Sequence, residues 1–301
     1  MIIGTGLRVG RYRAVIGWVA VLAPAPYLVL KVAWIAGSAA GITDSALLTD
    51  PAYRIANVAS IVADLIAVAV ALALTRRFGL GLPAPLVLVP MWVATGFLAP
   101  IIILTPTAAP LADADSARGL SPWVYVVVYA SFTTQGLVLL AAFALYAADR
   151  WGRLEPIMSV NQTSTRRLIT AICLLACLAL FGGYLCWIVG IAYPPGRLSA
   201  VDRVTLAVYA LFALAAAAGV ATLDRPTATV ARRWSALAAV WLGSSSMLSW
   251  GAYYLALAAW RPRLATPQLA AAAALKVALS VVLVAILVAR FRPGAARAAD
   301  G

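Results

Sequence analysis

The sequence predicts an all-α fold, a polytopic integral membrane bundle of about eight transmembrane helices. Two observations on composition point to it. Hydrophobic residues make up 64% of the chain and charged residues only 11%, whereas soluble domains carry about 25% charged residues. The third observation is that the apolar residues fall into runs of about 20, the length that spans the hydrocarbon core of a bilayer. The apolar side chains are therefore expected to face lipid as well as one another.

Eight apolar runs account for the predicted helices, and Pro, Gly or Arg residues separate them. The first run follows a basic start, as in a signal peptide, but it continues past Pro26, so we expect an uncleaved first span. Arg76 and Arg77 separate the second run from the third. In chain order the runs are Ala14–Ala36, Ala52–Leu74, Ala84–Thr105, Pro122–Ala147, Leu168–Ala192, Val204–Leu223, Trp234–Ala259 and Leu269–Ala289.

Basic residues in the connections predict the orientation, because they collect on the cytoplasmic side of membrane proteins. Fifteen Arg residues fall in the two termini and in the second–third, fourth–fifth and sixth–seventh connections, against five in the other connections. Both termini are therefore expected in the cytoplasm. The predicted organisation is a cytoplasmic segment at 1–13, a single transmembrane domain at 14–290 and a cytoplasmic tail at 291–301. Short sequence matches between 14–147 and 168–290 hint at a parallel four-plus-four repeat.

The charge balance and the absence of histidine argue against several classes of function. A net charge of +13 is typical of nucleic-acid-binding proteins, but here the Arg residues lie between apolar runs, so we expect no nucleic-acid partner. Without His there is no imidazole base and no His-ligated metal site. Cys173 and Cys177 lie in one apolar run and are expected to be small buried residues, so no metal and no cofactor are predicted.

Three ionisable side chains lie within predicted spans, where a charge is costly and usually serves function. Lys31 and Lys276 fall in the outer parts of the first and eighth spans, and Asp64 lies near the middle of the second. At roughly 1.5 Å per residue, Lys31 and Asp64 differ in depth by less than about 10 Å, so they can meet if the two spans pack together. For Lys276 the favoured interpretation is a side chain that extends to the outer headgroups.

Polar residues also form faces on the predicted helices. Asn57 and Asp64 share one helical face of the second span with Ser60, and Gln135 lies near the middle of the fourth span. The Ser residues of the seventh span form a similar polar face. Their alternative role is helix packing, because small hydroxyl residues also bring helices together in lipid. The candidate ligand-binding residues are Lys31, Asn57, Asp64 and Gln135, with Lys276, Ser249 and Tyr253 as secondary candidates. No catalytic residue is assigned.

Proline and glycine residues within the spans predict interrupted helices, which often line binding sites in transporters. The first and third spans are expected to be interrupted, and the fifth to be weakened. Aromatic residues near the span ends, Trp34 and Tyr53 among them, are assigned to the membrane–water interface. The breaks are expected at Pro24, Pro26, Pro90 and Pro100, and the weakening at Gly182-Gly183.

Three stretches of the chain resemble a group of uncharacterised actinobacterial multi-pass membrane proteins. They are Gly17-Trp18 with Pro26-Tyr27, Leu30-Lys31, Trp34 and Gly37-Ser38; Pro90-Met91-Trp92 with Thr95-Gly96 and Leu98-Ala99-Pro100; and Gln135-Gly136-Leu137 with Tyr146 and Asp149-Arg150-Trp151. The resemblance implies a multi-pass protein of the bacterial plasma membrane. That group has no assigned activity, so the resemblance adds no mechanism.

The leading hypothesis is transport or binding of a small anionic or amphipathic molecule through a pocket open to the outer side. One alternative is a membrane-embedded enzyme that acts on a lipid or isoprenoid with Asp64 as general acid. Another is a non-catalytic accessory membrane subunit. An enzyme is the less favoured class. The expected partners are membrane lipids and a small-molecule ligand, and the sequence gives no oligomeric state.

Overall fold

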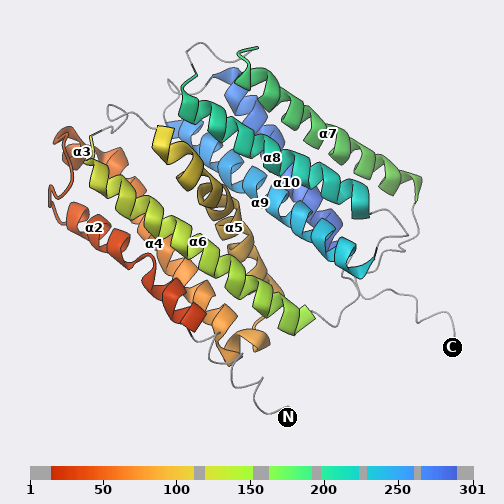
Figure 1. The fold of residues 1–301 in the computed structure, drawn as a ribbon, viewed down its shortest axis with the longest axis horizontal. Coiled ribbons are helices and arrows are strands. Elements are labelled where there is room, and N and C mark those ends of the chain that lie inside the picture. The colour runs from red at the N-terminus through yellow and green to blue at the C-terminus, as the bar shows by residue number, and fades with distance from the viewer. Residues whose placement is uncertain are drawn as a thin grey trace. The chain divides into compact units, whose positions relative to one another are not determined.

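The computed structural model describes residues 15–111, 119–151, 163–191, 198–223, 229–260 and 266–289. The predicted terminal segments, 1–13 and 291–301, lie outside these residues. The described part is helical and contains no strand, only one isolated bridge between Ile42 and Leu120. The chain divides into two compact units, Met1–Arg153 (unit 1) and Leu154–Gly301 (unit 2), whose helices are labelled in Figure 1.

Seven helices among the described residues are long and apolar enough to cross a membrane, which confirms the multi-pass helical class. They are Val15–Ile35, Pro51–Thr75, Ala84–Leu111, Pro122–Trp151, Ser164–Ile188, Ala200–Leu223 and Pro267–Val288. Another long helix, α9 at Val230–Trp260, covers the predicted seventh span. It is less hydrophobic than these seven because it carries several Ser, Trp and Tyr residues. The total of eight spans therefore stays a prediction, as does the orientation of the termini.

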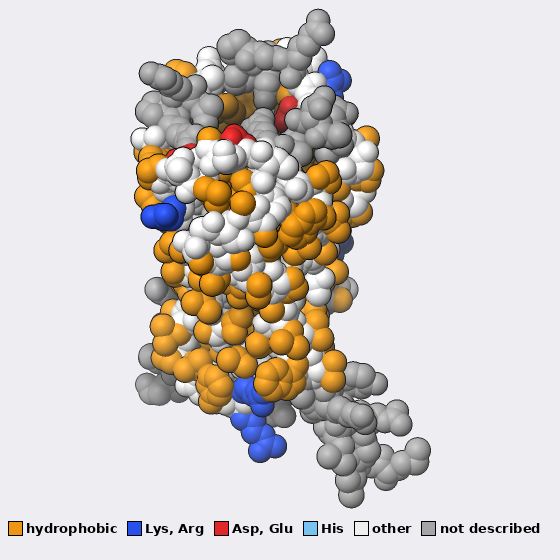
Figure 2. Space-filling view, turned by 90° about the vertical axis from the view of Figure 1, so that its left-hand side faces the viewer, with side chains coloured by type: hydrophobic (Ala, Val, Ile, Leu, Met, Phe, Trp, Pro, Cys, Tyr) orange, Lys and Arg blue, Asp and Glu red, His pale blue; other side chains and the backbone are white. Residues whose placement is uncertain are grey.

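Large apolar side chains cover the outward faces of the helices. Val29, Val126, Leu175 and Val189 are among those that are mostly exposed. Figure 2 shows one face of the molecule on which hydrophobic side chains predominate over the middle part. In water, a protein with such a surface would aggregate, whereas the hydrocarbon of a bilayer solvates the surface well.

Unit 1 is built around α4 (Pro51–Thr75), which contacts α2 (Ala25–Ile35), α5 (Ala84–Ala108) and α6 (Pro122–Trp151). The Asp50 carboxylate caps α4 by accepting a hydrogen bond of 2.8 Å from the backbone N–H of Ala52. The short helix α3 (Ala46–Thr49) follows α2. The bridge between Ile42 and Leu120 joins the chain after α2 to the chain before α6. The end of α2 and the starts of α4 and α6 therefore share one end of unit 1, called here the α3 end.

Proline interrupts one predicted span and leaves another intact. In the first span, a turn at residues 23 and 24 separates the helical segment 15–22 from α2. In contrast, α5 continues through Pro90, Pro100 and Pro106, and α7 (Ser164–Ile188) continues through Gly182 and Gly183. The interruption predicted in the third span is therefore wrong, and the two glycines expected to weaken the fifth span leave its helix unbroken. Each proline removes one backbone N–H donor from its helix. The neighbouring backbone hydrogen bonds still keep the helix intact, because the bilayer core contains no water to compete for them.

The end of unit 1 away from α3 is tied together through the short helix η1 (Arg77–Gly81). The Tyr146 hydroxyl on α6 donates a hydrogen bond of 2.9 Å to the Gly79 carbonyl. Arg150 donates to the Tyr146 hydroxyl and, at 2.7 Å, to the Leu82 carbonyl. A Cβ atom at Gly79 would lie only 1.6 Å from the carbonyl oxygen of Ala73, so no larger residue fits there without moving the backbone.

Unit 2 is a four-helix bundle of α7, α8 (Ala200–Leu223), α9 and α10 (Pro267–Ala289). Each helix packs on the next one in the chain, and α10 also contacts α7, so the bundle closes. Small residues bring α8 and α9 close together: a Cβ atom at Gly243 would lie 2.6 Å from the Ala216 side chain and 2.6 Å from the Phe212 carbonyl. Gly183 on α7, in contrast, has open space around it.

Candidate functional site

A buried ion pair joins the first two spans of unit 1. The Lys31 ammonium on α2 donates a hydrogen bond of 2.6 Å to Asp64 Oδ2 on α4. Lys31 is completely buried, and Asp64 is 5% exposed. The contact that the predicted depths allowed is therefore present. Pairing two opposite charges is the arrangement that makes buried ionisable groups tolerable within a membrane bundle.

Aromatic rings surround the ammonium of Lys31. Its Nζ atom lies 3.8 Å from the ring centroid of Tyr27, one helical turn earlier on α2, and 5.8 Å from the ring centroid of Phe132 on α6. The two rings meet edge to face with their centroids 5.2 Å apart. The ammonium therefore combines a charge pair with a cation–π contact, which is worth roughly 2 kcal/mol when it is desolvated.

A polar stripe runs along α4 from the α3 end to the ion pair. Tyr53, Asn57, Ser60 and Asp64 recur at the spacing of one helical face. The Asn57 side-chain amide donates to the Tyr53 carbonyl at 3.0 Å, and the Ser60 hydroxyl donates to the Asn57 carbonyl at 2.9 Å. The buried Tyr53 hydroxyl has no hydrogen-bond partner among the described residues. The stripe thus offers a polar route into an otherwise apolar bundle.

Gln135 lies on α6 at the same distance along its helix as Asp64 on α4, thirteen residues from the first residue of each. It is 1% exposed, and its Nε2 atom has no hydrogen-bond partner within the described part of the chain. Its neighbour one turn earlier is Phe132, which packs near Lys31. A buried amide donor without an acceptor is costly, so it marks a place where an acceptor would be stabilising.

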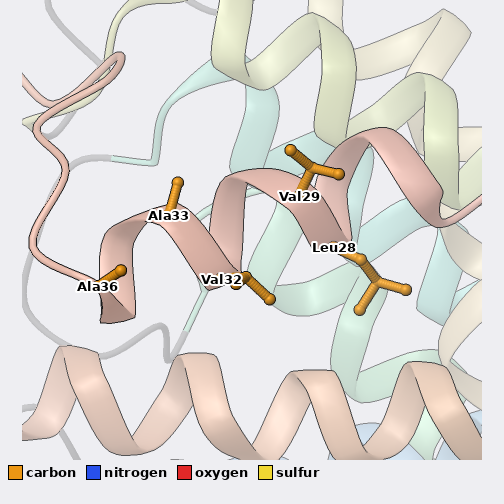
Figure 3. Close-up of a pocket in the computed structure, with 5 residues that line it drawn as sticks. All are labelled: Leu28, Val29, Val32, Ala33 and Ala36. Atoms are coloured by element: carbon orange, nitrogen blue, oxygen red, sulfur yellow. The ribbon is translucent and has the colours of Figure 1, made fainter.

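A surface hollow of unit 1 lies on α2 and does not include the ion pair. Figure 3 shows its five lining side chains, all of them apolar, four carried by α2 and one by Ala36, the residue directly after it. Lys31, on the same helix, is buried against α4 instead. The hollow is therefore an apolar groove on the surface of α2, and the ion pair is enclosed by protein. The lining residues are Leu28, Val29, Val32, Ala33 and Ala36.

The secondary candidates all belong to unit 2 and do not share one environment. Lys276 on α10 is 7% exposed, so the side chain is buried in the bundle rather than extended to the headgroups as expected. Ser249 on α9 is also buried, whereas Tyr253 is 49% exposed and packs its ring against Trp250, with centroids 5.7 Å apart. The structure therefore brings Lys31 and Asp64 together and leaves Tyr253 on the outer surface of α9.

Sequence reasoning missed the aromatic part of the site in unit 1. The sequence patterns include Tyr27 only through the resemblance to the membrane-protein group and do not single out Phe132, while Trp34 and Tyr53 are assigned to the membrane–water interface. In the structure the Trp34 ring packs 5.9 Å from Tyr53 and 6.4 Å from Tyr27, with Trp34 buried. The i, i+4 spacing of Tyr27 and Lys31 was the available signal, because it places both residues on one face of the helix.

No protein-family model, curated protein or solved structure matches this chain.

Proposed function

We propose that this multi-pass membrane protein binds a small anionic or amphipathic molecule within unit 1 and transports it. The observation that carries the proposal is the Lys31–Asp64 pair, which is fully enclosed in an apolar bundle. Apolar residues of similar size often stabilise a protein as well as a buried ion pair does, or better. A pair of this kind within a membrane domain is therefore best explained by use, and not by stability.

An unsatisfied amide at the depth of the pair favours an anion as the ligand. Gln135 Nε2 is a buried donor without a partner in the described part of the chain, and the Lys31 ammonium is a second donor. A carboxylate, phosphate or sulfonate group offers acceptors to both. In the proposed mechanism the anionic group replaces Asp64 as the partner of Lys31 and accepts from Gln135.

The aromatic rings account for the amphipathic part of the proposed ligand. Tyr27 and Phe132 provide apolar ring surface beside the ammonium, and Trp34 extends it toward the α3 end. An anion that enters adds its negative charge to a neutral pair, so cations that match this charge must accompany it, one of them to neutralise Asp64. The route of entry is the polar stripe of α4.

The test is uptake into liposomes that contain the purified full-length protein. The probes are radiolabelled succinate and benzenesulfonate, two anions that cross a bare bilayer slowly. The wild-type protein is expected to give saturable uptake, and Lys31→Met to reduce it to the level of empty liposomes. Gln135→Leu is expected to raise the half-saturating concentration by about tenfold, because a hydrogen bond to a charged group is lost.

The control variant is Thr133→Val on α6, two residues before Gln135. The Thr133 hydroxyl donates to the Thr105 hydroxyl at 2.9 Å and has no role in the proposed site, so uptake should remain at the wild-type level. If Lys31→Met folds and transports both probes as well as wild type does, the proposal is wrong. Saturable binding without uptake would instead assign the chain a binding role alone.

A further inference from the structure

Unit 2 contains a buried lysine without an acidic partner. Lys276 on α10 is 7% exposed, and no described carboxylate pairs with it. Among the described residues of unit 2, a carboxylate is found only at Asp202. It accepts hydrogen bonds from Ser199 at the start of α8. A buried ammonium without a counter-charge is costly in a low-dielectric bundle.

Aromatic rings offset this cost only in part. The Lys276 ammonium lies 5.1 Å from the ring centroid of Tyr254 and 5.4 Å from that of Tyr209. Both distances exceed the 3.8 Å between the Lys31 ammonium and Tyr27 in unit 1, so the cation–π contacts are weaker. The longer distances also leave space next to the ammonium.

A narrow cavity opens at Lys276. Its volume is about 10 Å³, which suits one small ion or water molecule and nothing larger. Ser246 on α9 lines the same cavity and is 4% exposed. The remaining lining is mainly apolar and aromatic, from Tyr184, Tyr209, Phe212, Ala213, Met247 and Trp250.

Close helix packing holds the lysine at this cavity. A Cβ atom at Gly251 on α9 would lie 3.2 Å from the Lys276 Cβ and 3.0 Å from the Ala273 carbonyl, so the glycine lets α10 approach α9 there. The stem of Lys276 is thereby fixed against α9, the helix that also carries Ser246. One ammonium and one buried hydroxyl thus line a space of single-ion size.

We propose that this cavity binds a small monovalent anion of the size of chloride, held by the Lys276 ammonium and the Ser246 hydroxyl. The anion supplies the counter-charge that the described residues of unit 2 lack, and the hydroxyl donates a hydrogen bond to it. The site is separate from the one proposed in unit 1 and does not depend on it. Its occupant is an inorganic ion, because the cavity has no room for an organic body.

The experiment measures the thermal unfolding of the full-length protein in nanodiscs through its tryptophan fluorescence. Chloride is titrated against gluconate at constant ionic strength. A ligand that binds only the folded state raises the melting temperature with the logarithm of its concentration, so we expect about 3 °C for each tenfold increase above half-saturation. Lys276→Met should abolish this chloride-dependent shift.

Two serine variants keep the test decisive if Lys276→Met fails to fold. Ser246→Ala should raise the half-saturating chloride concentration by about tenfold. Ser280→Ala is the matched control: Ser280 is buried on the helix of Lys276, and its hydroxyl already donates to the Val277 carbonyl at 2.7 Å. It should leave the chloride shift unchanged.

The proposal is overturned by any of three results. The first is that wild type melts at the same temperature in chloride and in gluconate, in which case the cavity holds water. The second is that Lys276→Met keeps the full chloride shift, which would place the ion elsewhere. The third is that Ser246→Ala and Ser280→Ala change the shift equally, which would remove the role of the Ser246 hydroxyl.

Discussion

Breaking the ion pair of unit 1 should destabilise the protein far more than breaking a neutral hydrogen bond. With an effective dielectric constant of about 20, opposite unit charges 2.6 Å apart attract by about 6 kcal/mol. Desolvation of both groups offsets much of this attraction. Removing one partner nevertheless leaves the other charge buried and unpaired, at a cost of about 3–5 kcal/mol. Asp64→Asn and Lys31→Met should each lower the free energy of unfolding by that amount.

The double variant Lys31→Met/Asp64→Asn should regain most of the loss. It leaves no unpaired charge, so the largest part of the cost of each single substitution is removed. The coupling energy of the double-mutant cycle isolates the pair from other effects of each substitution. The assay is the unfolding of the full-length protein in detergent by added sodium dodecyl sulfate, followed by tryptophan fluorescence.

An internal comparison is provided by the hydroxyl pair of Thr105 and Thr133, whose oxygen atoms are 2.9 Å apart. Neutral hydrogen bonds between membrane helices contribute about 0.6 kcal/mol on average, so Thr133→Val should have a small effect. The reasoning is refuted if Asp64→Asn costs no more than Thr133→Val. It is equally refuted if the two single losses add in the double variant, because the two charges would then not interact.

Three further substitutions test the packing of the units, each by the melting temperature of the purified protein. Gly79→Ala should cost more than about 2 kcal/mol, because its Cβ would overlap a backbone carbonyl, while Gly81→Ala, which meets no neighbour, should change little. Gly243→Ala should separate α8 from α9 at a cost of about 1–3 kcal/mol, whereas Gly183→Ala on α7 should be neutral or stabilising; equal effects of these two would contradict the packing. Tyr146→Phe should cost about 1 kcal/mol through the hydrogen bond lost to the η1 carbonyl, and a wild-type melting temperature would show that this bond adds nothing.

The ion pair shows how far the sequence reaches toward the site. Residue counting placed Lys31 and Asp64 at similar depths, since a helix rises by a constant amount per residue. Helical periodicity also placed Asn57 on the face of Asp64. Neither rule says that this face of α4 meets the Lys31 face of α2. Which faces meet depends on how whole helices pack. In the structure these two faces do meet, and Lys31 Nζ lies 2.6 Å from Asp64 Oδ2.

Lys276 shows the opposite case. The sequence is equally compatible with two positions of a lysine near the end of a span: its side chain can extend to the headgroups or be buried. Only the packed bundle distinguishes these two positions. Gly251 lets α9 and α10 approach each other, and this close packing encloses the stem of the lysine. Proline was misleading for a related reason: Pro90 breaks no helix, since the hydrogen bonds of the surrounding turns hold α5 in place.

Sequence patterns suffice for the helical multi-pass class and for the approximate positions of the seven described helices that are long and apolar enough to cross a membrane. These follow from local rules, because lipid requires long apolar runs and internal backbone hydrogen bonds whatever the helices pack against. The tertiary structure alone decided which polar groups meet: Lys31 has Asp64, whereas Lys276 has aromatic rings and a narrow cavity. The physical reason is that partner choice depends on contacts between residues far apart in the chain, which no local pattern encodes.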